Sequence, residues 1–174
     1  DDLVRAACAE AAQQEVVEAV NFNAPGQVVI AGHKAAVTRA IEACKAKGAK
    51  RALPLPVSAP FHSALMRPAA ERLRTYLADV KVGVPSAQLI NNVDVKVETH
   101  PSAIKEALVR QAASPVRWVE TVRRMRDEGV THVLECGPGR VLAGMVKRID
   151  AGLPVFALAD KASLEQALAA VRGG

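Results

Sequence analysis

The chain has 174 residues, half of them hydrophobic, and a formal net charge of +5. This length allows one compact domain or two small lobes with a core, and no apolar run approaches the roughly 20 residues that a membrane span needs. The aromatic residues are three Phe, one Tyr and one Trp, too few for a stacking platform on single-stranded nucleic acid. We therefore expect no nucleic acid and no membrane as partner. A mildly basic face suits an acidic protein or a phosphorylated small molecule.

Cysteine usage and the first residues suggest the setting of the chain. Cys8, Cys44 and Cys136 are odd in number and widely spaced, which favours neither a disulfide framework nor a zinc site. A reducing cytoplasm fits best, and we expect no metal and no redox cofactor. The chain begins at Asp1, without an initiator Met or a signal peptide, in what reads as the start of a helix. We therefore expect residues upstream of this chain to be missing.

The first 57 residues predict the order helix, hairpin, helix, strand. Asp1 is expected to cap the opening helix, and a turn at 23–26 gains its special backbone angles from Pro25 and Gly26. The second helix is expected to stop at Gly48, because glycine is favoured just after a helix. The strands of this part are predicted over 16–22, 28–31 and 51–57. The order is that of a β-α-β-β-α-β unit without its first strand.

The remaining residues alternate helices with strands, as in a layered α/β domain. Pro68 is expected to begin a helix, Ser102 to cap the next one, and Ser114-Pro115 to start a third that stops at Gly129. The strands of this part are predicted over 88–93, 95–99, 130–136 and 153–158. The fold class is therefore α/β, with a small lobe over 1–57 and a larger part over 58–174.

Two segments near the C-terminus have local signatures. Gly137-Pro138-Gly139 is predicted to turn from a buried strand into a helix. Its free amides could face an anion, but the motif is short and unspecific and favours a plain strand-to-helix turn. Ser163 with Gln166 predicts a capping box for the last helix.

His62 is the first candidate for chemistry. It follows a predicted strand and precedes a predicted helix, which is where α/β folds display functional side chains. A neutral imidazole there could act as a general base, and a loop histidine with only structural contacts is the alternative. No serine of the chain lies in a Gly-x-Ser-x-Gly elbow, so no nucleophile is predicted.

Six segments together resemble one family. They are 21–32, 53–66, 91–94, 108–111, 114–118 and 135–139. On these segments the chain is similar to the malonyl-CoA:acyl carrier protein transacylases of bacterial type II fatty acid synthesis, and the similarity covers nearly its whole length. The resemblance implies an incomplete ferredoxin-like small lobe over 1–57 and the C-terminal part of a hydrolase-like α/β core over 58–174.

The resemblance also implies a mechanism. In such enzymes a Ser takes the malonyl group from malonyl-CoA, and the phosphopantetheine thiol of acyl carrier protein then takes it from the Ser. His62 would be the base for both steps, oriented by the backbone carbonyl of Gln111. The Ser elbow, the Arg that grips the malonyl carboxylate and an oxyanion-hole Gln lie upstream in relatives. We therefore expect this segment alone to be inactive.

Four further residues receive roles from the resemblance. Asn23 and Phe61 would contact the substrate, and a bulky residue beside the catalytic His is expected to disfavour branched acyl groups. Lys147 and Arg148 would dock the acidic carrier protein, on a helix that the match puts near the mouth of the active site. Phe61 as a filler of the lobe boundary, and the two cations as a solvated helix face, are the structural alternatives.

The resemblance leaves one rival function open. The chain could be a non-catalytic module that kept the acyltransferase shape, lost its Ser, and binds CoA or carrier protein without turnover. In either case CoA enters as a thioester substrate or ligand and not as a resident cofactor.

Overall fold

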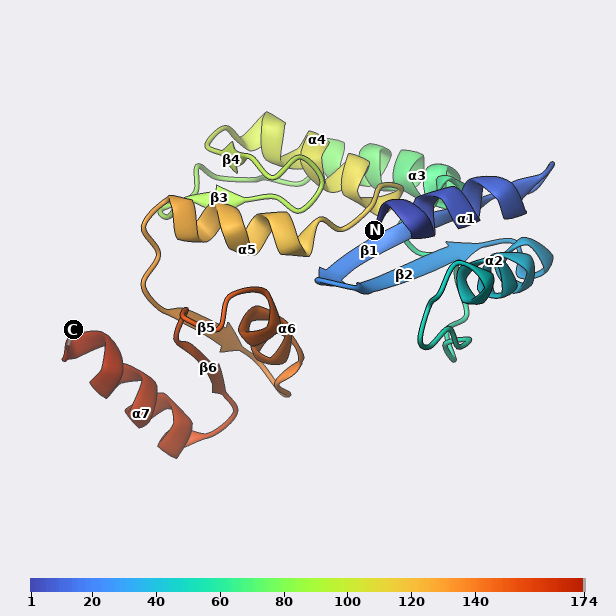
Figure 1. The fold of residues 1–174 in the computed structure, drawn as a ribbon. Coiled ribbons are helices and arrows are strands. Elements are labelled where there is room, and N and C mark those ends of the chain that lie inside the picture. Colours follow the sequence, from blue (N-terminus) through green and yellow to red (C-terminus); the bar gives the residue numbers. More distant parts are fainter. Residues whose placement is uncertain (174) are drawn as a thin grey trace. The chain divides into compact units, whose positions relative to one another are not determined.

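A computed structural model describes residues 1–173 of the chain (Figure 1). Its residues form two compact units, one over Asp1–Trp118 and one that starts at Val119. Helices and short strands are mixed throughout, which confirms the predicted α/β class. The division by packing differs from the boundary after residue 57, which was predicted from the pattern of elements and stays a prediction.

The elements differ in length between the two kinds of structure: most helices are long, whereas the strands after the hairpin are short. The helices are α1 (Asp2–Ala12), α2 (Lys34–Ala46), the 3-10 turn η1 (Ala64–Met66), α3 (Arg67–Ala78), α4 (Pro101–Ala112), α5 (Trp118–Asp127), α6 (Val141–Ile149) and α7 (Lys161–Arg172). The strands are β1 (Val17–Ala24), β2 (Gln27–Gly32), β3 (Leu89–Ile90), β4 (Val97–Glu98), β5 (Val133–Cys136) and β6 (Val155–Leu158).

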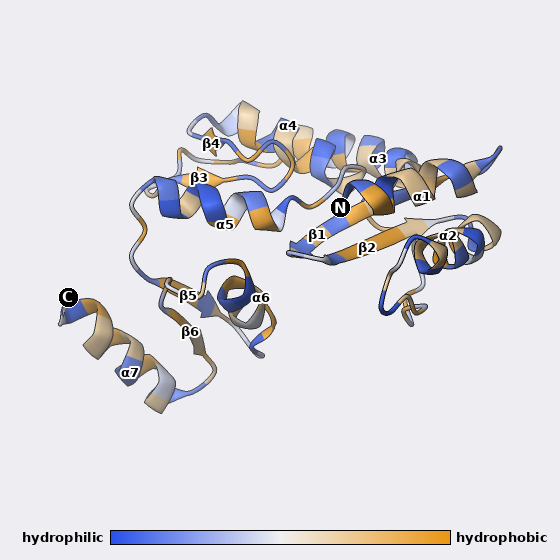
Figure 2. Cartoon of the chain, viewed as in Figure 1, coloured by the Kyte–Doolittle hydropathy of each residue, from blue (hydrophilic) through white to orange (hydrophobic). Residues whose placement is uncertain are grey.

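β1 and β2 form the predicted antiparallel hairpin. Its turn is Pro25-Gly26, with Gly26 at φ +71°, so the turn is two residues long and Asn23 lies in β1, not in the turn as predicted. Proline presets the first turn position and glycine tolerates the positive φ of the second. β2 is hydrophobic over most of its length (Figure 2).

The two faces of β1 are different. Burial alternates along the strand except for two consecutive buried residues at Ala19 and Val20, where a register shift marks a bulge. Val17 packs into the core that α1 and α2 form over one face, and Arg5 of α1 lies 4.3 Å from the Phe22 ring centroid. The half-buried side chains are on the other face, at Glu18, Asn21 and Asn23. We call these three residues the polar face of β1.

The core under α1 and α2 is made of small side chains. Ala7, Ala11, Ala36 and Ala40 are buried, and their size lets the two helices approach the hairpin closely. Burial also raises the pKa of the Cys8 thiol to about 11, so this thiol stays protonated at neutral pH. It is a core residue and not a nucleophile.

The segment 51–57 is not the predicted strand. Among the described residues it has no ladder partner, and Pro54 and Pro56 offer no N–H. Leu53, Leu55 and Val57 are all more than half exposed. The sequence pattern of this segment is therefore typical of a β-strand, but no strand among the described residues pairs with it.

α3 and α4 pack against each other through Ala70, Leu77 and Val109. α3 has a proline in its first turn, as predicted. α4 begins at Pro101 with His100 as its cap, so the prediction that Ser102 caps this helix is wrong. The Ser102 hydroxyl lies 2.8 Å from His100 Nδ1 instead.

α5 begins three residues later than Ser114-Pro115. The reason is tertiary: Val116 donates its N–H to Val20 O (2.8 Å) and accepts from Phe22 N (2.9 Å), so this segment is a strand-like partner of β1. A backbone that pairs with a strand is extended and cannot be helical at the same residue.

The second unit is built on the parallel pair β5 and β6, with α6 between them in the chain. α7 has a capping box, but it is formed by Asp160 and Ser163, three residues earlier than the predicted pair Ser163 and Gln166. The Asp160 carboxylate accepts from Ser163 N at 2.8 Å, and these hydrogen bonds hold its pKa below the usual value.

Glu135 of β5 caps α6. Its two carboxylate oxygens accept from Leu142 N (3.1 Å) and Ala143 N (2.8 Å). A carboxylate is favourable there because the first N–H groups of a helix lack internal partners and carry partial positive charge. Two of the amides at the start of the helix after Gly137-Pro138-Gly139 are thus satisfied by the chain itself, which favours a strand-to-helix turn over an anion site.

We predict that Glu135→Ala lowers the free energy of unfolding by about 1 kcal/mol, because two N–H groups lose their cap. Chemical denaturation measures the change. Glu165→Ala is the matched control, since Glu165 is an exposed residue of α7 with a single ion pair of 3.6 Å to Lys161. It should cost less than about 0.5 kcal/mol. Equal losses in the two variants would contradict the cap assignment.

Candidate functional site

The loop before α3 holds His62 in an unusual backbone conformation. His62 has φ +64°, in the left-handed region that few non-glycine residues adopt. Ser63 beside it is fully buried, and its N–H and hydroxyl both donate to Pro60 O, at 3.2 and 2.7 Å. On the far side, Ala64 donates its N–H to Glu18 Oε2 at 2.8 Å. The neighbours of His62 thus fix a backbone turn that places its ring.

The ring of His62 contacts the end of α4. Its Nδ1 lies 2.9 Å from the backbone carbonyl oxygen of Gln111, the acceptor that the resemblance implied. In a longer helix this carbonyl would accept from residue 115, but that residue is proline and has no N–H. The end of α4 therefore leaves a carbonyl available for the imidazole.

This contact fixes the tautomer of His62. A carbonyl oxygen can only accept, so Nδ1 carries the proton and Nε2 keeps its lone pair. His33 has the opposite arrangement, because its Nδ1 accepts from Val16 N at 2.9 Å and its neutral ring must therefore be protonated at Nε2. His62 is accordingly set up to take a proton at Nε2, whereas His33 is not.

The Gln111 side chain connects the His62–Gln111 contact to the loop at 91–94. Its Oε1 accepts from Asn92 N at 3.3 Å, and Asn92 O accepts from Arg117 N at 3.1 Å. Asn91, which is buried, holds this loop by accepting from Val93 N and Asp94 N. The segment 91–94 contributes to the resemblance, but sequence reasoning gave it no role. The available signal was two consecutive Asn residues near the end of a predicted strand.

The other predicted site residues have different surroundings. Asn23 lies on the polar face of β1, the same face whose Glu18 holds the His62 loop. Phe61 is 53% exposed, so it does not fill the core of its unit. Lys147 and Arg148 are exposed residues of the last turn of α6, in the second unit.

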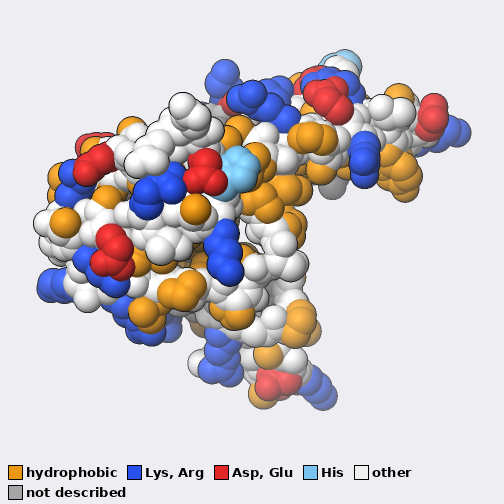
Figure 3. Space-filling view, turned by 90° about the vertical axis from the view of Figure 1, so that its right-hand side faces the viewer, with side chains coloured by type: hydrophobic (Ala, Val, Ile, Leu, Met, Phe, Trp, Pro, Cys, Tyr) orange, Lys and Arg blue, Asp and Glu red, His pale blue; other side chains and the backbone are white. Residues whose placement is uncertain are grey.

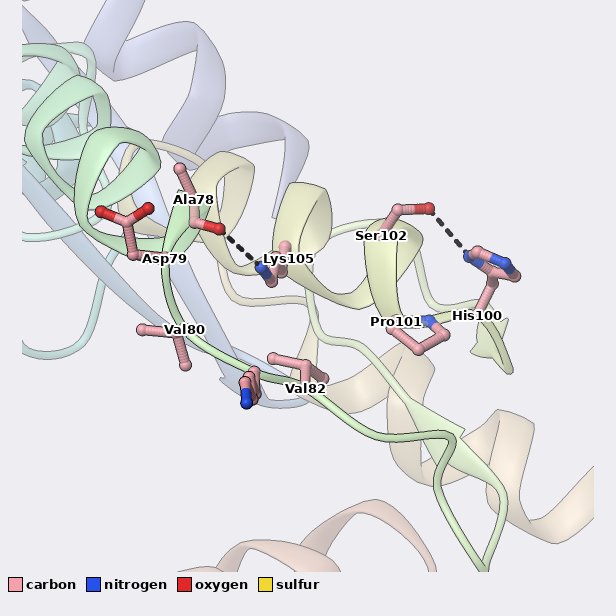
Figure 4. A pocket seen from close by; sticks show the side chains of 9 residues that line it. Ala78, Asp79, Val80, Val82, His100, Pro101, Ser102 and Lys105 are labelled. Atoms are coloured by element: carbon pink, nitrogen blue, oxygen red, sulfur yellow. Dashed lines mark hydrogen bonds between the residues drawn. The ribbon is translucent and has the colours of Figure 1, made fainter.

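Two hollows open on the surface. One, of about 650 Å³, lies between the end of α3 and the start of α4 and is lined by Asp79, His100 and Lys105 among others (Figure 4). None of the predicted site residues lines it. The other, of about 430 Å³, is in the second unit and includes Arg140, Lys147 and Phe156. Lys147 is the predicted site residue that lines this second hollow.

The surface and the side-chain clusters bear on other kinds of site. On the face seen in Figure 3, basic side chains are interspersed with acidic and hydrophobic ones and form no single patch. Within residues 1–173 no three His, Cys, Asp or Glu side chains gather in a way that could hold a metal ion. A search of the same residues finds no helix with the length and hydrophobicity to cross a bilayer.

Comparison with known proteins gives the family. A family model described as the acyl transferase domain matches residues 2–160. The chain belongs to the acyl transferase domain family. It is 54% identical over 168 residues to the malonyl CoA-acyl carrier protein transacylase of Escherichia coli (strain K12), a match that covers 97% of this chain and 54% of that protein. The chain thus spans about half the length of the curated relatives it matches.

Solved structures agree. An acyl-carrier-protein S-malonyltransferase from Burkholderia pseudomallei 1710b is 64% identical with a TM-score of 0.94, over 97% of this chain and 55% of that one. A malonyl-transacylase solved in complex with a type II polyketide synthase acyl-carrier protein is 52% identical, also with a TM-score of 0.94, over 100% of this chain and 55% of its own. The chain therefore has the fold of the corresponding half of these enzymes.

Proposed function

We propose that this chain is the histidine-bearing part of an enzyme that transfers malonyl groups from CoA to acyl carrier protein. The single observation on which the proposal depends is the 2.9 Å contact between His62 Nδ1 and Gln111 O, in a chain of the acyl transferase family. The nucleophilic Ser would lie in the part of the family fold that this chain does not span. His62 would be the general base.

The proton transfers balance in both halves of such a reaction. His62 Nε2 takes the proton of the Ser hydroxyl as the oxygen attacks the malonyl thioester, and returns it to the departing CoA thiolate. In the second half it takes the proton of the phosphopantetheine thiol, whose sulfur attacks the malonyl ester, and returns it to the Ser oxygen. The Gln111 carbonyl stabilises the imidazolium of each step while adding no formal charge near the malonyl carboxylate.

The alternative to malonyl transfer is a module that binds CoA or carrier protein without turnover. The absence of a Ser elbow from the chain would favour it, but a module that only binds has no need of an imidazole in one fixed tautomer. Incubation of the full-length protein with malonyl-CoA separates the two, because a transferase gains the mass of a malonyl ester and a module does not.

Free thiols at all three cysteines suit the reducing cytoplasm that we propose as its setting.

A pair of variants in the full-length protein tests the roles of His62 and Gln111. His62→Ala should reduce malonyl transfer by roughly 10²–10⁴-fold, the scale of a lost acid–base group. Gln111→Ala should keep most of the activity, because the backbone carbonyl remains and only the 3.3 Å contact to Asn92 N is lost. Near-normal transfer by His62→Ala would show that His62 is not the general base. An equal loss in both variants would show that the Gln111 side chain, and not its carbonyl alone, is essential.

We further propose that Asn23 and Phe61 contact the substrate. Glu18, on the same face of β1 as Asn23, contacts the His62 loop, and Phe61 directly precedes His62. Because Phe61 is more than half exposed, its ring is available to limit the space beside the α-carbon of the acyl group.

Phe61→Ser should therefore raise the ratio of kcat/KM for methylmalonyl-CoA to that for malonyl-CoA. A branch methyl that overpacks a site typically costs about 1–3 kcal/mol, which corresponds to roughly 10- to 200-fold discrimination. Steady-state kinetics with both thioesters measures the ratio. A variant that folds normally and leaves the ratio unchanged would show that Phe61 has only a packing role.

Carrier-protein docking is the last part of the proposal. Lys147 and Arg148 are exposed cations at the end of α6, where positive charge also suits the helix dipole. A relative 52% identical to this chain was solved with its acyl-carrier protein bound, which supports a protein partner of that kind.

Reversing both charges, Lys147→Glu with Arg148→Glu, should raise KM for acyl carrier protein several-fold and leave KM for malonyl-CoA unchanged. Charges at the rim of an interface mainly affect association rate and salt dependence, so the difference from wild type should shrink at high salt. Lys161→Glu in α7 is the control, because this lysine is also exposed. Equal effects on both substrates, or none, would exclude docking by α6.

A further inference from the structure

We infer that Glu18 is a positioning residue for His62: its carboxylate holds the His62 loop in the backbone conformation that directs the ring at Gln111. The starting observation is the contact of 2.8 Å between Glu18 Oε2 and Ala64 N, which joins residues 46 apart in the chain. It is partly buried, so water competes with it only in part. This inference rests on the function proposed for His62.

The backbone of the loop needs a restraint. His62 has φ +64°, and such a conformation persists in a non-glycine residue only where the surroundings impose it. Ser63, the next residue, is buried and bound to Pro60 O, which closes the turn around His62. Ala64 after it opens η1, and its N–H has no acceptor within the turn, which leaves the Glu18 carboxylate as its partner.

β1, the strand of Glu18, also pairs with the segment that follows Gln111, whose carbonyl is the acceptor of the His62 ring. β1 pairs with Val116 through Val20 O and Phe22 N, only five residues after Gln111. Glu18 lies two residues before Val20, on the polar face of the strand. β1 is thus attached to both sides of the His62–Gln111 contact, once through a side chain and once through its backbone. Loss of the Glu18 contact frees one side while the other stays fixed.

Glu18 does not act on the ring itself. Its recorded hydrogen bond is to a backbone N–H, and the ring nitrogen Nδ1 is bound to Gln111 O. What matters is therefore an acceptor of the correct length and not a negative charge. Glu18→Gln keeps such an acceptor, Glu18→Asp keeps the charge but is one methylene shorter, and Glu18→Ala removes both.

The test uses the full-length protein with 15N-labelled histidine. NMR reports whether His62 is protonated at Nδ1 or Nε2, steady-state kinetics gives kcat and KM for malonyl transfer, and thermal unfolding gives stability. Glu10→Ala is the matched control, since Glu10 is a glutamate of the same unit whose 2.9 Å ion pair joins α1 to Lys47 at the end of α2 and does not involve the loop.

We expect Glu18→Ala and Glu18→Asp to shift His62 towards the Nε2-protonated tautomer and to lower kcat by about 10- to 100-fold with little change in KM, as for a catalytic group that is misplaced. Glu18→Gln and Glu10→Ala should match wild type. If Glu18→Ala does not fold, the difference in tautomer and kcat between Glu18→Gln and Glu18→Asp tests the inference.

Three results would overturn the inference. They are an unchanged tautomer in Glu18→Ala or Glu18→Asp, a loss in Glu18→Gln as large as in Glu18→Asp, and a loss in Glu10→Ala equal to that in the Glu18 variants. Failure of the proposed function looks different: wild type then transfers no malonyl group, while the tautomer still reports on Glu18.

Discussion

The hydrogen bond from His62 Nδ1 to Gln111 O is the constraint on which the rest of the site depends. It joins a loop to the end of a helix across 49 residues of sequence. For the bond to form, the carbonyl must lack a helical partner, which Pro115 ensures, and the loop must hold a left-handed residue, which Ser63 and Ala64 enforce through their own contacts. Each requirement is met by backbone geometry, so the chemistry of the ring depends on how the chain is folded locally around it.

β1 connects these requirements. One of its faces is covered by α1 and α2 over a core of small residues, which leaves the other face to interact with the His62 loop through Glu18. Its edge pairs with Val116, and this pairing delays the start of α5 and keeps the segment after Gln111 extended. β1, which the sequence pattern predicts as one strand of a hairpin, therefore also contacts both segments that form the candidate site.

The sequence predicts those features that depend on nearby residues. The hairpin turn with Pro25 and Gly26 and the proline at the start of α3 follow from residue types within a few positions. The resemblance to the family, and not the local pattern, pointed to His62 with Gln111. Features that depend on distant partners were missed. The segment 51–57 has the pattern of a strand but no partner among the described residues, and the contact of Glu18 with Ala64 leaves no local trace in the sequence.

The two acceptors of the site have different charges, and their assignment has a physical reason. The ring receives a neutral carbonyl, so the tautomer is fixed without a formal negative charge that would repel a malonyl carboxylate. The charged acceptor, Glu18, meets a backbone N–H at the start of η1, where partial positive charge favours a carboxylate. Exchanging the two would place negative charge at the imidazole, strengthen it as a base, and oppose the binding of an anionic acyl group. A neutral acceptor beside the ring is thus compatible with the anionic acyl group of the proposed function.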